Sequence, residues 1–122
     1  MNDPFRRLSD ILARCADARS LVVRGRGAFE EDPILRHAAK SIITEIGEAA
    51  KNLEGLADEL AGVPWTQVAR MRDRVIHRYF DIDYDVVWET LNADLPRLEH
   101  AVQTFLGDRW PDEGPGNADQ MM

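Results

Sequence analysis

Four long stretches of the chain repeat apolar residues every three or four positions, and no stretch shows the alternation of apolar and polar residues that is typical of a strand. This period places the apolar side chains of each stretch on one face of a helix. The chain is therefore expected to fold as an all-α, up-and-down bundle of four main helices. The predicted helices span approximately residues 5–23, 33–60, 64–80 and 84–106.

Short local signals mark the ends of these helices. Asp32 followed by Pro33 supplies a capping carboxylate and a proline at the first helical position. Gly25 and Gly27 predict a turn after the first helix. Pro96 lies inside the fourth helix, where it removes a backbone donor, so a kink or a short break is expected just before it.

Length and composition indicate one soluble domain. A chain of 122 residues can bury a single core, which we assign to residues 1–106, and the Gly-, Pro- and polar-rich segment 107–122 is expected to be a flexible tail. No apolar run is long enough to span a membrane and the first residues do not resemble a signal peptide, so we expect a cytoplasmic protein with no membrane contact. The net charge of -7 argues against bulk electrostatic coating of nucleic acid, but it leaves a local basic site open.

The residues that usually hold metals and cofactors are sparse. Cys15 is the single cysteine, which excludes an intramolecular disulfide and a cysteine-based zinc site, and we expect it to lie in the core. The three histidines are scattered, and His37 and His100 are expected to be surface residues. There is no Gly-rich phosphate loop. We therefore predict neither a metal site nor a cofactor.

Residues 70–80 concentrate the chemistry of the chain, with four arginines, one of the three histidines and one of the two tyrosines. An imidazole can take and give a proton near neutral pH, and a guanidinium can hold a phosphate and stabilise developing charge. Arg72 and His77 are thus a candidate catalytic pair for metal-independent RNA cleavage, in which His77 would act on the ribose 2′-hydroxyl or the leaving 5′-oxygen. The candidate contacts to RNA phosphates are Arg70, Arg74 and Arg78.

Helical geometry restricts this pairing. Five residues along a regular helix leave Arg72 and His77 about 140° apart around the axis. The two side chains converge only if the helix loosens near His77 or if they come from different subunits. Asp73 lies four residues before His77 on the same face, so it could orient the imidazole.

Small residues around Gly47 would let another helix approach the second helix closely. Glu45 and Glu48 flank this patch. They belong either to a solvated helix face or to the edge of a site, where a carboxylate would pair with an arginine of residues 70–80. A plainer interpretation of residues 70–80 is a charged helix end in which the arginines pair with nearby acids and Tyr79 bonds a neighbour through its hydroxyl.

The arrangement Arg72-x4-His77-x-Tyr79 resembles the Arg-x4-His-x-Tyr motif of HepT-like toxins, which are small helical ribonucleases of the HEPN superfamily. The resemblance covers roughly residues 5–106. It departs from the family at Asp73, where members often have Asn. Further similar segments are Ile-Gly-Glu-Ala-Ala at 46–50, Pro-Trp at 64–65, and Asp83 followed by Val-Trp at 87–88.

The resemblance implies that Arg72 and His77 are the catalytic pair. Asp73, from its spacing to His77, and Glu48, from its place beside the small-residue patch, are the candidate supporting residues. It also implies a homodimer that brings two motifs into one cleft, and an RNA substrate such as tRNA or mRNA. The usual partner of the family is an MNT-type nucleotidyltransferase antitoxin of a type VII toxin–antitoxin system, which neutralises the toxin by transferring AMP to the motif tyrosine. Tyr79 is the matching position, and AMP there would repel and block incoming RNA.

Two other functions remain open at the level of the sequence. The chain could be a non-catalytic helical module that binds a nucleotidyltransferase, either as its substrate or as a nucleotide-binding accessory subunit. It could also be a purely structural four-helix protein. Dependence of growth inhibition on His77 would separate a ribonuclease from both of these alternatives.

Overall fold

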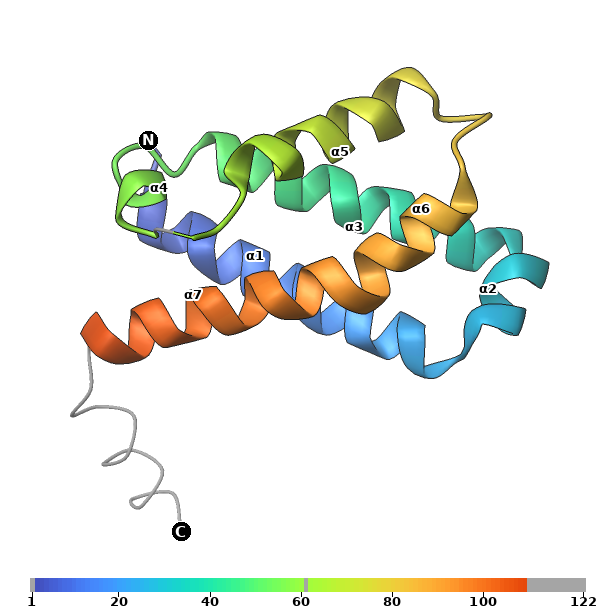
Figure 1. Cartoon of the computed structure of the whole chain (residues 1–122), viewed down its shortest axis with the longest axis horizontal. Coiled ribbons are helices and arrows are strands. Elements are labelled where there is room, and N and C mark those ends of the chain that lie inside the picture. Colours follow the sequence, from blue (N-terminus) through green and yellow to red (C-terminus); the bar gives the residue numbers. More distant parts are fainter. Residues whose placement is uncertain (1, 61, 110–122) are drawn as a thin grey trace, which may run out of the picture.

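A computed structural model describes residues 2–60 and 62–109, which are helical and contain no strand (Figure 1). The all-α prediction is confirmed. None of the described helices has the length and hydropathy needed to cross a membrane. In chain order the elements are α1 (Pro4–Val23), α2 (Arg26–Glu31), α3 (Pro33–Lys51), α4 (Leu56–Glu59), α5 (Trp65–His77), α6 (Tyr84–Glu89), the π-helix η1 (Thr90–Asp94) and α7 (Leu95–Arg109).

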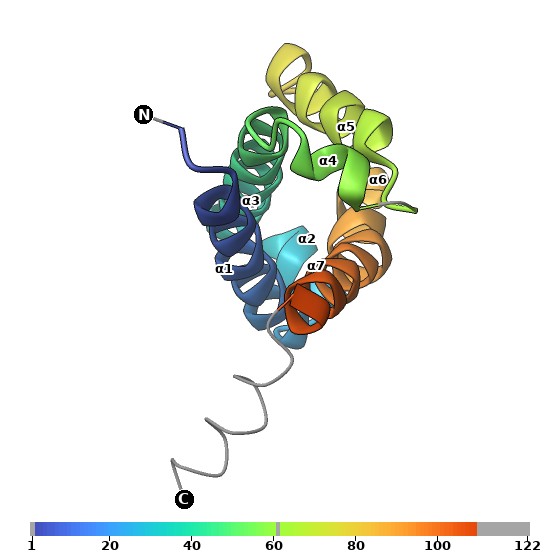
Figure 2. The same cartoon turned by 90° about the vertical axis from the view of Figure 1, so that its left-hand side faces the viewer.

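The long helices run up and down around one core. α1 packs against α3, α5 packs chiefly against α3, and the continuous run of α6, η1 and α7 packs against α1 (Figure 1). Seen along their axes, these four segments surround a common interior (Figure 2). The predicted bundle of four main helices is confirmed. Its fully buried side chains include Leu8, Ile11, Phe29, Ile46, Val75, Leu91 and Val102.

Aspartate side chains cap the starts of α3 and α6. The Asp32 side chain accepts a hydrogen bond from the backbone N–H of Ile34 at 2.9 Å, and Pro33 is the first residue of α3. The Asp83 side chain accepts one from the N–H of Asp85 at 2.9 Å. Because each carboxylate satisfies an otherwise unpaired helical donor, the start of α3 is fixed, as its sequence predicts.

The second predicted helix is shorter than expected, because α3 ends at Lys51 and not near residue 60. The chain leaves the helix through Glu54, whose φ of 54° is left-handed. Leu53, Leu56 and Leu60 are nevertheless buried, in a loop and in the single turn of α4. The apolar spacing therefore predicted correctly that these leucines are buried, but it did not show that the helix ends before them.

The turn predicted at the two glycines is only partly right. Gly25 turns the chain with φ of 92°, but Gly27 lies within α2, a six-residue helix that the periodicity does not show. α2 is held by Phe29, which is fully buried and contacts the rings of Tyr84 and Trp88 at centroid distances of 5.9 and 5.3 Å. Burial of one aromatic side chain thus orders a segment that glycine alone would leave as a loop.

The distortion expected before Pro96 is present as the π-helix η1. The N–H of Leu95 bonds to the carbonyl of Thr90, five residues back, and the Thr90 hydroxyl donates to the Val86 carbonyl at 2.9 Å. This widened turn accommodates the proline without ending the helix. α7 then continues to Arg109, beyond the predicted end near residue 106, so residues 107–109 of the predicted tail are helical. The rest of that tail, residues 110–122, lies outside the described residues.

Cys15 is a core residue, as predicted. Its side chain is 1% exposed and its Sγ lies 3.8 Å from the carbonyl oxygen of Leu95, where α1 crosses α7. Burial raises the pKa of the Cys15 thiol from 9.0 to about 11. The thiol therefore stays protonated at neutral pH and has no part in the candidate site.

Candidate active site

Arg72 of α5 passes directly over Gly47 of α3. A Cβ atom at Gly47 would lie 2.3 Å from the Cβ of Arg72 and 2.6 Å from its Cγ, well inside contact distance. Only glycine leaves room for this approach. The close contact predicted at Gly47 is confirmed, and it holds Arg72 against α3.

Two carboxylates bind the guanidinium of Arg72. Its Nη2 donates to Oε2 of Glu48 at 2.6 Å, and its Nη1 donates to Oδ1 of Asp73 at 3.0 Å. The Arg72 side chain is only 18% exposed, and its Nε is buried without a hydrogen-bond partner among the described residues. Arg72 is therefore held in one orientation, with its charge largely balanced.

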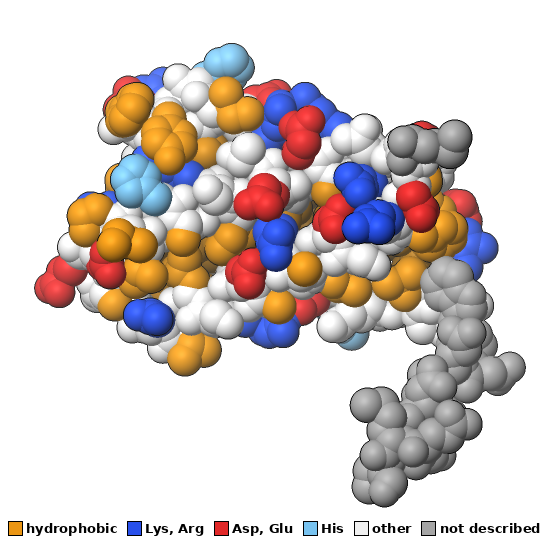
Figure 3. Space-filling view, turned by 180° about the vertical axis from the view of Figure 1, so that it is seen from behind, with side chains coloured by type: hydrophobic (Ala, Val, Ile, Leu, Met, Phe, Trp, Pro, Cys, Tyr) orange, Lys and Arg blue, Asp and Glu red, His pale blue; other side chains and the backbone are white. Residues whose placement is uncertain are grey.

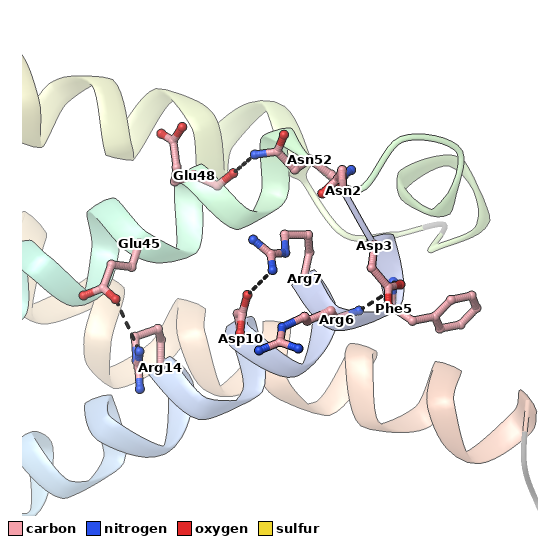
Figure 4. A network of polar contacts seen from close by, with 10 residues as sticks. All are labelled: Asn2, Asp3, Phe5, Arg6, Arg7, Asp10, Arg14, Glu45, Glu48 and Asn52. Carbon is pink, nitrogen blue, oxygen red and sulfur yellow. Dashed lines mark hydrogen bonds and ion pairs between the residues drawn. The ribbon is translucent and has the colours of Figure 1, made fainter.

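Glu45 and Glu48 point toward different helices (Figure 4). Glu48 points toward α5, where it meets Arg72, so of the two alternatives for this residue the structure supports the one that pairs it with an arginine of residues 70–80. Glu45 points toward α1, where its carboxylate is 3.3 Å from Nη1 of Arg14. Of the two glutamates, only Glu48 belongs to the candidate site.

His77 is the last residue of α5 and is exposed. Its side chain makes no hydrogen bond or ion pair with any of the described residues, 2–60 and 62–109. Asp73, the candidate for orienting the imidazole, bonds Arg72 instead. α5 stays helical through His77, and no hydrogen bond joins His77 to Arg72. Within one chain the two motif side chains therefore remain on diverging sides of the helix.

The opposite side of α5 carries basic side chains that no carboxylate of the described residues pairs with. Arg70, Arg74 and His77 are exposed and follow one another at helical spacings of four and three, so they form a stripe along α5. Neither Arg70 nor Arg74 is in an ion pair within the described part of the chain. Arg78, after the helix, pairs with Asp81 at 3.2 Å. The stripe is thus the part of residues 70–80 most available to an anion.

A groove of about 560 Å³ lies beside this stripe, between α3, α5, η1 and α7. Arg70 and Arg74 line it from α5, and Arg97 lines it from α7. Asp94 is the single acidic residue that lines it. The apolar lining residues include Ile43, Ile46, Val68, Met71, Leu95 and Leu98. A lining of arginines together with apolar side chains suits a ligand that carries phosphate charge together with flat apolar groups.

Tyr79 lies in the turn after α5 and packs on the first turns of α3. Its hydroxyl oxygen is 3.2 Å from Nδ1 of His37, and the two rings are stacked with centroids 6.1 Å apart. Nζ of Lys40 lies 4.1 Å from the Tyr79 ring centroid and donates a hydrogen bond to the Tyr79 carbonyl oxygen. Tyr79 thus bonds a neighbour through its hydroxyl, as the plainer interpretation of residues 70–80 expects.

His37 and Lys40 are absent from the residues that the sequence singles out. His37 is exposed, as predicted, but its contact with Tyr79 joins residues 42 positions apart, which no local pattern reveals. Lys40 offers one signal, because it stands between apolar residues of a predicted helix and is one of only two lysines. It is 3% exposed, and a buried lysine needs specific partners.

The described residues thus offer the unbonded imidazole of His77 and the unpaired guanidiniums of Arg70 and Arg74 on one face of α5. The guanidinium of Arg72 is held on another face, and the phenol of Tyr79 lies beside the imidazole of His37. None of their His, Cys, Asp and Glu side chains form a group of three or more that could hold a metal ion. This set of groups can bind phosphates and transfer protons.

Comparison with known families identifies the chain. A family model described as ribonuclease HepT-like matches residues 11–105, which include every residue of the candidate site. The chain belongs to the HepT-like ribonuclease family. The resemblance inferred from Arg72, His77 and Tyr79 is confirmed, and membership of the family identifies the chain as a ribonuclease.

Curated relatives agree with this assignment. A protein of Caldanaerobacter subterraneus subsp. tengcongensis, named as a candidate RNase, is 37% identical over 111 residues, which cover 87% of this chain and 96% of that protein. The probable ribonuclease HepT of Thermococcus cleftensis is 46% identical over 55 residues, 44% of this chain and 50% of that protein. A candidate RNase of Methanocaldococcus jannaschii is 30% identical over 81 residues, with coverage of 66% and 67%. No solved structure gives a significant match.

In this HepT-like chain the motif is divided by the end of α5. Arg72 and His77 lie on the helix, but Arg78 is its C-cap, with its N–H bonded to the Arg74 carbonyl at 3.0 Å. Tyr79 therefore lies in the following turn and not on the third main helix, where the whole motif was predicted. The turn lets the Tyr79 side chain reach α3 without following the helical period of Arg72 and His77.

Proposed function

We propose that this HepT-like ribonuclease cleaves RNA without a metal ion, using Arg72 of one chain and His77 of a second chain in a homodimer. The observation that carries the proposal is the regular helix between the two motif residues. It keeps them on diverging sides of α5, so that a composite site needs a second copy. Further support comes from His77, which is exposed and has no bonding partner among the described residues.

The chemistry follows from the two side chains. The imidazole of His77 accepts the proton of a ribose 2′-hydroxyl, and the 2′-oxygen attacks the adjacent phosphorus. The bond from phosphorus to the 5′-oxygen breaks, and that oxygen takes up a proton. The products are a 2′,3′-cyclic phosphate and a 5′-hydroxyl. Arg72 stabilises the charge on the non-bridging oxygens with the N–H donors that Glu48 and Asp73 leave free.

The stripe of unpaired cations would hold the RNA backbone. Arg70 and Arg74 are exposed and unbalanced, and Arg78 shares only a surface ion pair that a phosphate can replace. On a protein with a net charge of -7, this local patch selects where a polyanion binds. Single-stranded regions of a tRNA or an mRNA fit such a site, because their phosphates and bases are both accessible.

The finer role that we propose is that of the toxin in a type VII toxin–antitoxin pair in the cytoplasm. An MNT-type nucleotidyltransferase antitoxin would transfer AMP to the Tyr79 hydroxyl. Tyr79 follows His77 by two residues in the turn after α5, so an attached AMP would add negative charge and bulk two residues from His77. Incoming RNA would then be excluded from the site.

One observation favours a second candidate function. Arg72 already bonds Glu48 and Asp73, so a phosphate has to compete with two carboxylates for it. If the phosphate cannot displace these carboxylates from Arg72, the chain would be a non-catalytic partner, or a nucleotide-binding accessory subunit, of a nucleotidyltransferase. It would bind the transferase and accept AMP without cleaving RNA.

Cleavage of total RNA and tRNA in the presence of EDTA tests the proposal, after intact mass has shown that Tyr79 is unmodified. We expect cleavage by the wild type and a loss of at least about a hundredfold in His77→Ala. His100→Ala is the matched control, because His100 is an exposed histidine of α7 outside the site, and it should retain full activity. Cleavage that survives in His77→Ala refutes the assignment. No cleavage by the unmodified wild type favours the accessory subunit.

A further inference from the structure

The two tyrosines of the chain lie beside the same lysine, but only one has a base at its hydroxyl. Nζ of Lys40 is 4.1 Å from the ring centroid of Tyr79 and 5.2 Å from that of Tyr84. The Tyr79 hydroxyl has Nδ1 of His37 at 3.2 Å, whereas the Tyr84 hydroxyl bonds no described residue. Tyr84 is therefore an internal reference for the effect of His37 on a phenol.

Lys40 is buried in an unusual way. Its side chain is 3% exposed, yet no carboxylate among the described residues pairs with it. A buried ammonium group is costly unless other groups replace its water. Here the Tyr79 carbonyl oxygen and the faces of the two tyrosine rings do so. The positive charge of Lys40 is thus kept unneutralised directly under the ring of Tyr79.

We propose that His37 is the general base that activates the Tyr79 hydroxyl for nucleotide transfer, and that Lys40 is a positioning residue that also stabilises negative charge on the phenol. This inference rests on the proposed modification of Tyr79. It deepens that proposal, because it makes the acceptor chain supply the base for its own modification. The transferase then needs to supply only the nucleotide and the geometry of attack.

The step balances with a nucleoside triphosphate as the co-reactant. In the tautomer with a proton on Nε2, Nδ1 of His37 accepts the phenolic proton. The phenolate oxygen attacks the α-phosphorus, the bond from that phosphorus to the bridging oxygen breaks, and pyrophosphate leaves. The α-phosphate now joins the Tyr79 oxygen to adenosine as a phosphodiester. The proton on His37 passes to solvent, because the imidazole is exposed.

The surroundings of Tyr79 leave room for a partner. The Phe80 ring has its centroid 5.3 Å from that of Tyr79 and is 92% exposed. Ile34 and Ile76 are also exposed, at 74% and 43%. On the face shown in Figure 3, hydrophobic side chains gather between two histidine side chains near one end of the molecule. A transferase can therefore approach the phenol without unfolding any helix.

Acetylation by N-acetylimidazole, quantified by peptide mapping, tests the activated phenol without any partner. We expect Tyr79 to react faster than Tyr84. In His37→Gln the Tyr79 rate should fall at least about tenfold while the Tyr84 rate stays unchanged, because glutamine keeps a hydrogen bond but cannot take the proton. His100→Gln is the control and should match the wild type. An unchanged Tyr79 rate in His37→Gln overturns the proposal.

Lys40→Met separates the lysine from the histidine, since methionine fills similar space without charge. Both tyrosines should then be acetylated more slowly, in a variant whose circular dichroism shows an intact fold. Unchanged rates for both tyrosines would contradict the role given to Lys40.

Transfer of AMP from ATP by the MNT-type partner tests the same base in the proposed reaction. We expect His37→Gln to lower kcat at least about tenfold with the KM for the chain unchanged, and added imidazole to restore transfer to His37→Ala. Transfer to His37→Gln at the wild-type kcat refutes the role of His37 and leaves the modification of Tyr79 intact. Absence of AMP on the wild type, with an active partner, refutes the modification itself.

Discussion

Arg72 and Tyr79 belong to the same motif and both pack on α3, yet their surroundings carry opposite charges. Arg72 lies near the end of α3, where Glu48 and Asp73 hold its guanidinium. Tyr79 lies near the start of α3, where Lys40 and an imidazole surround its phenol. The contrast teaches that α3 can serve two chemistries, a held cation for a phosphate and an activated oxygen for a nucleotide.

The two regions also differ in what fixes them. Arg72 is positioned by contact between helices, because its Cβ and Cγ lie against the backbone of Gly47. Tyr79 is positioned by side chains in a surface turn, next to a fully exposed Phe80. Substitutions around Arg72 should therefore change stability together with cleavage, whereas substitutions around Tyr79 should change reactivity with little effect on the fold.

The largest effect on the candidate site is expected from Gly47→Ala. The added methyl meets Cβ of Arg72, which cannot move without its helix, so α5 must shift on α3. We expect a loss of about 2 kcal/mol in the free energy of unfolding by urea, and loss of RNA cleavage. Gly107→Ala is the control, since nothing lies within 4 Å of the new methyl, and it should be neutral or stabilising. Equal stability of the two variants would contradict the statement that tight contact with Gly47 positions Arg72.

An intermediate effect is expected from Glu48→Ala. The guanidinium of Arg72 loses one of its two carboxylate partners, so kcat for RNA cleavage should fall about tenfold as the side chain loses its fixed orientation. The pair is partly exposed, and the loss of stability should stay below about 1 kcal/mol. Glu45→Ala, which breaks a pair with Arg14 of α1, should leave kcat unchanged. A similar kcat for both variants would show that Glu48 does not support Arg72.

The smallest effect on stability is expected from Phe80→Ser. The Phe80 side chain is 92% exposed, so the free energy of unfolding, measured by thermal denaturation, should change by no more than about 0.5 kcal/mol. Phe29→Ala, which empties a fully buried site, should cost about 3 kcal/mol or more in the same assay. A marked loss of stability in Phe80→Ser would mean that the Tyr79 turn is packed as tightly as the Arg72 contact.

Local signals in the sequence predict much of this structure. Asp32 and Pro33 fix the start of α3, and Gly47 predicts the close approach of another helix. For Glu48, pairing with an arginine of the motif stretch is one of two alternatives that the sequence leaves open. Each of these inferences depends on the conformational preference or chemistry of one residue. They hold because the backbone at a helix start, or at a close helix crossing, admits few residue types.

The remaining features depend on contacts between distant residues. The apolar period past Lys51 reports burial of Leu53 and its neighbours equally well for a helix and for a loop. The pairing of His37 with Tyr79 depends on the direction that the chain takes after α5 ends at Arg78, which the helical period does not encode. The most informative contact of the Tyr79 region is therefore a tertiary one.

Complementation between two inactive variants tests most directly whether the site is shared by two copies of the chain. Arg72→Ala and His77→Ala would be unfolded together, refolded as a mixture, and assayed for RNA cleavage in EDTA. A shared site predicts recovery of about one quarter of the wild-type rate, because half of the dimers are mixed and each mixed dimer holds one complete site. A mixture as inactive as either variant alone would contradict a site in which Arg72 and His77 come from different subunits.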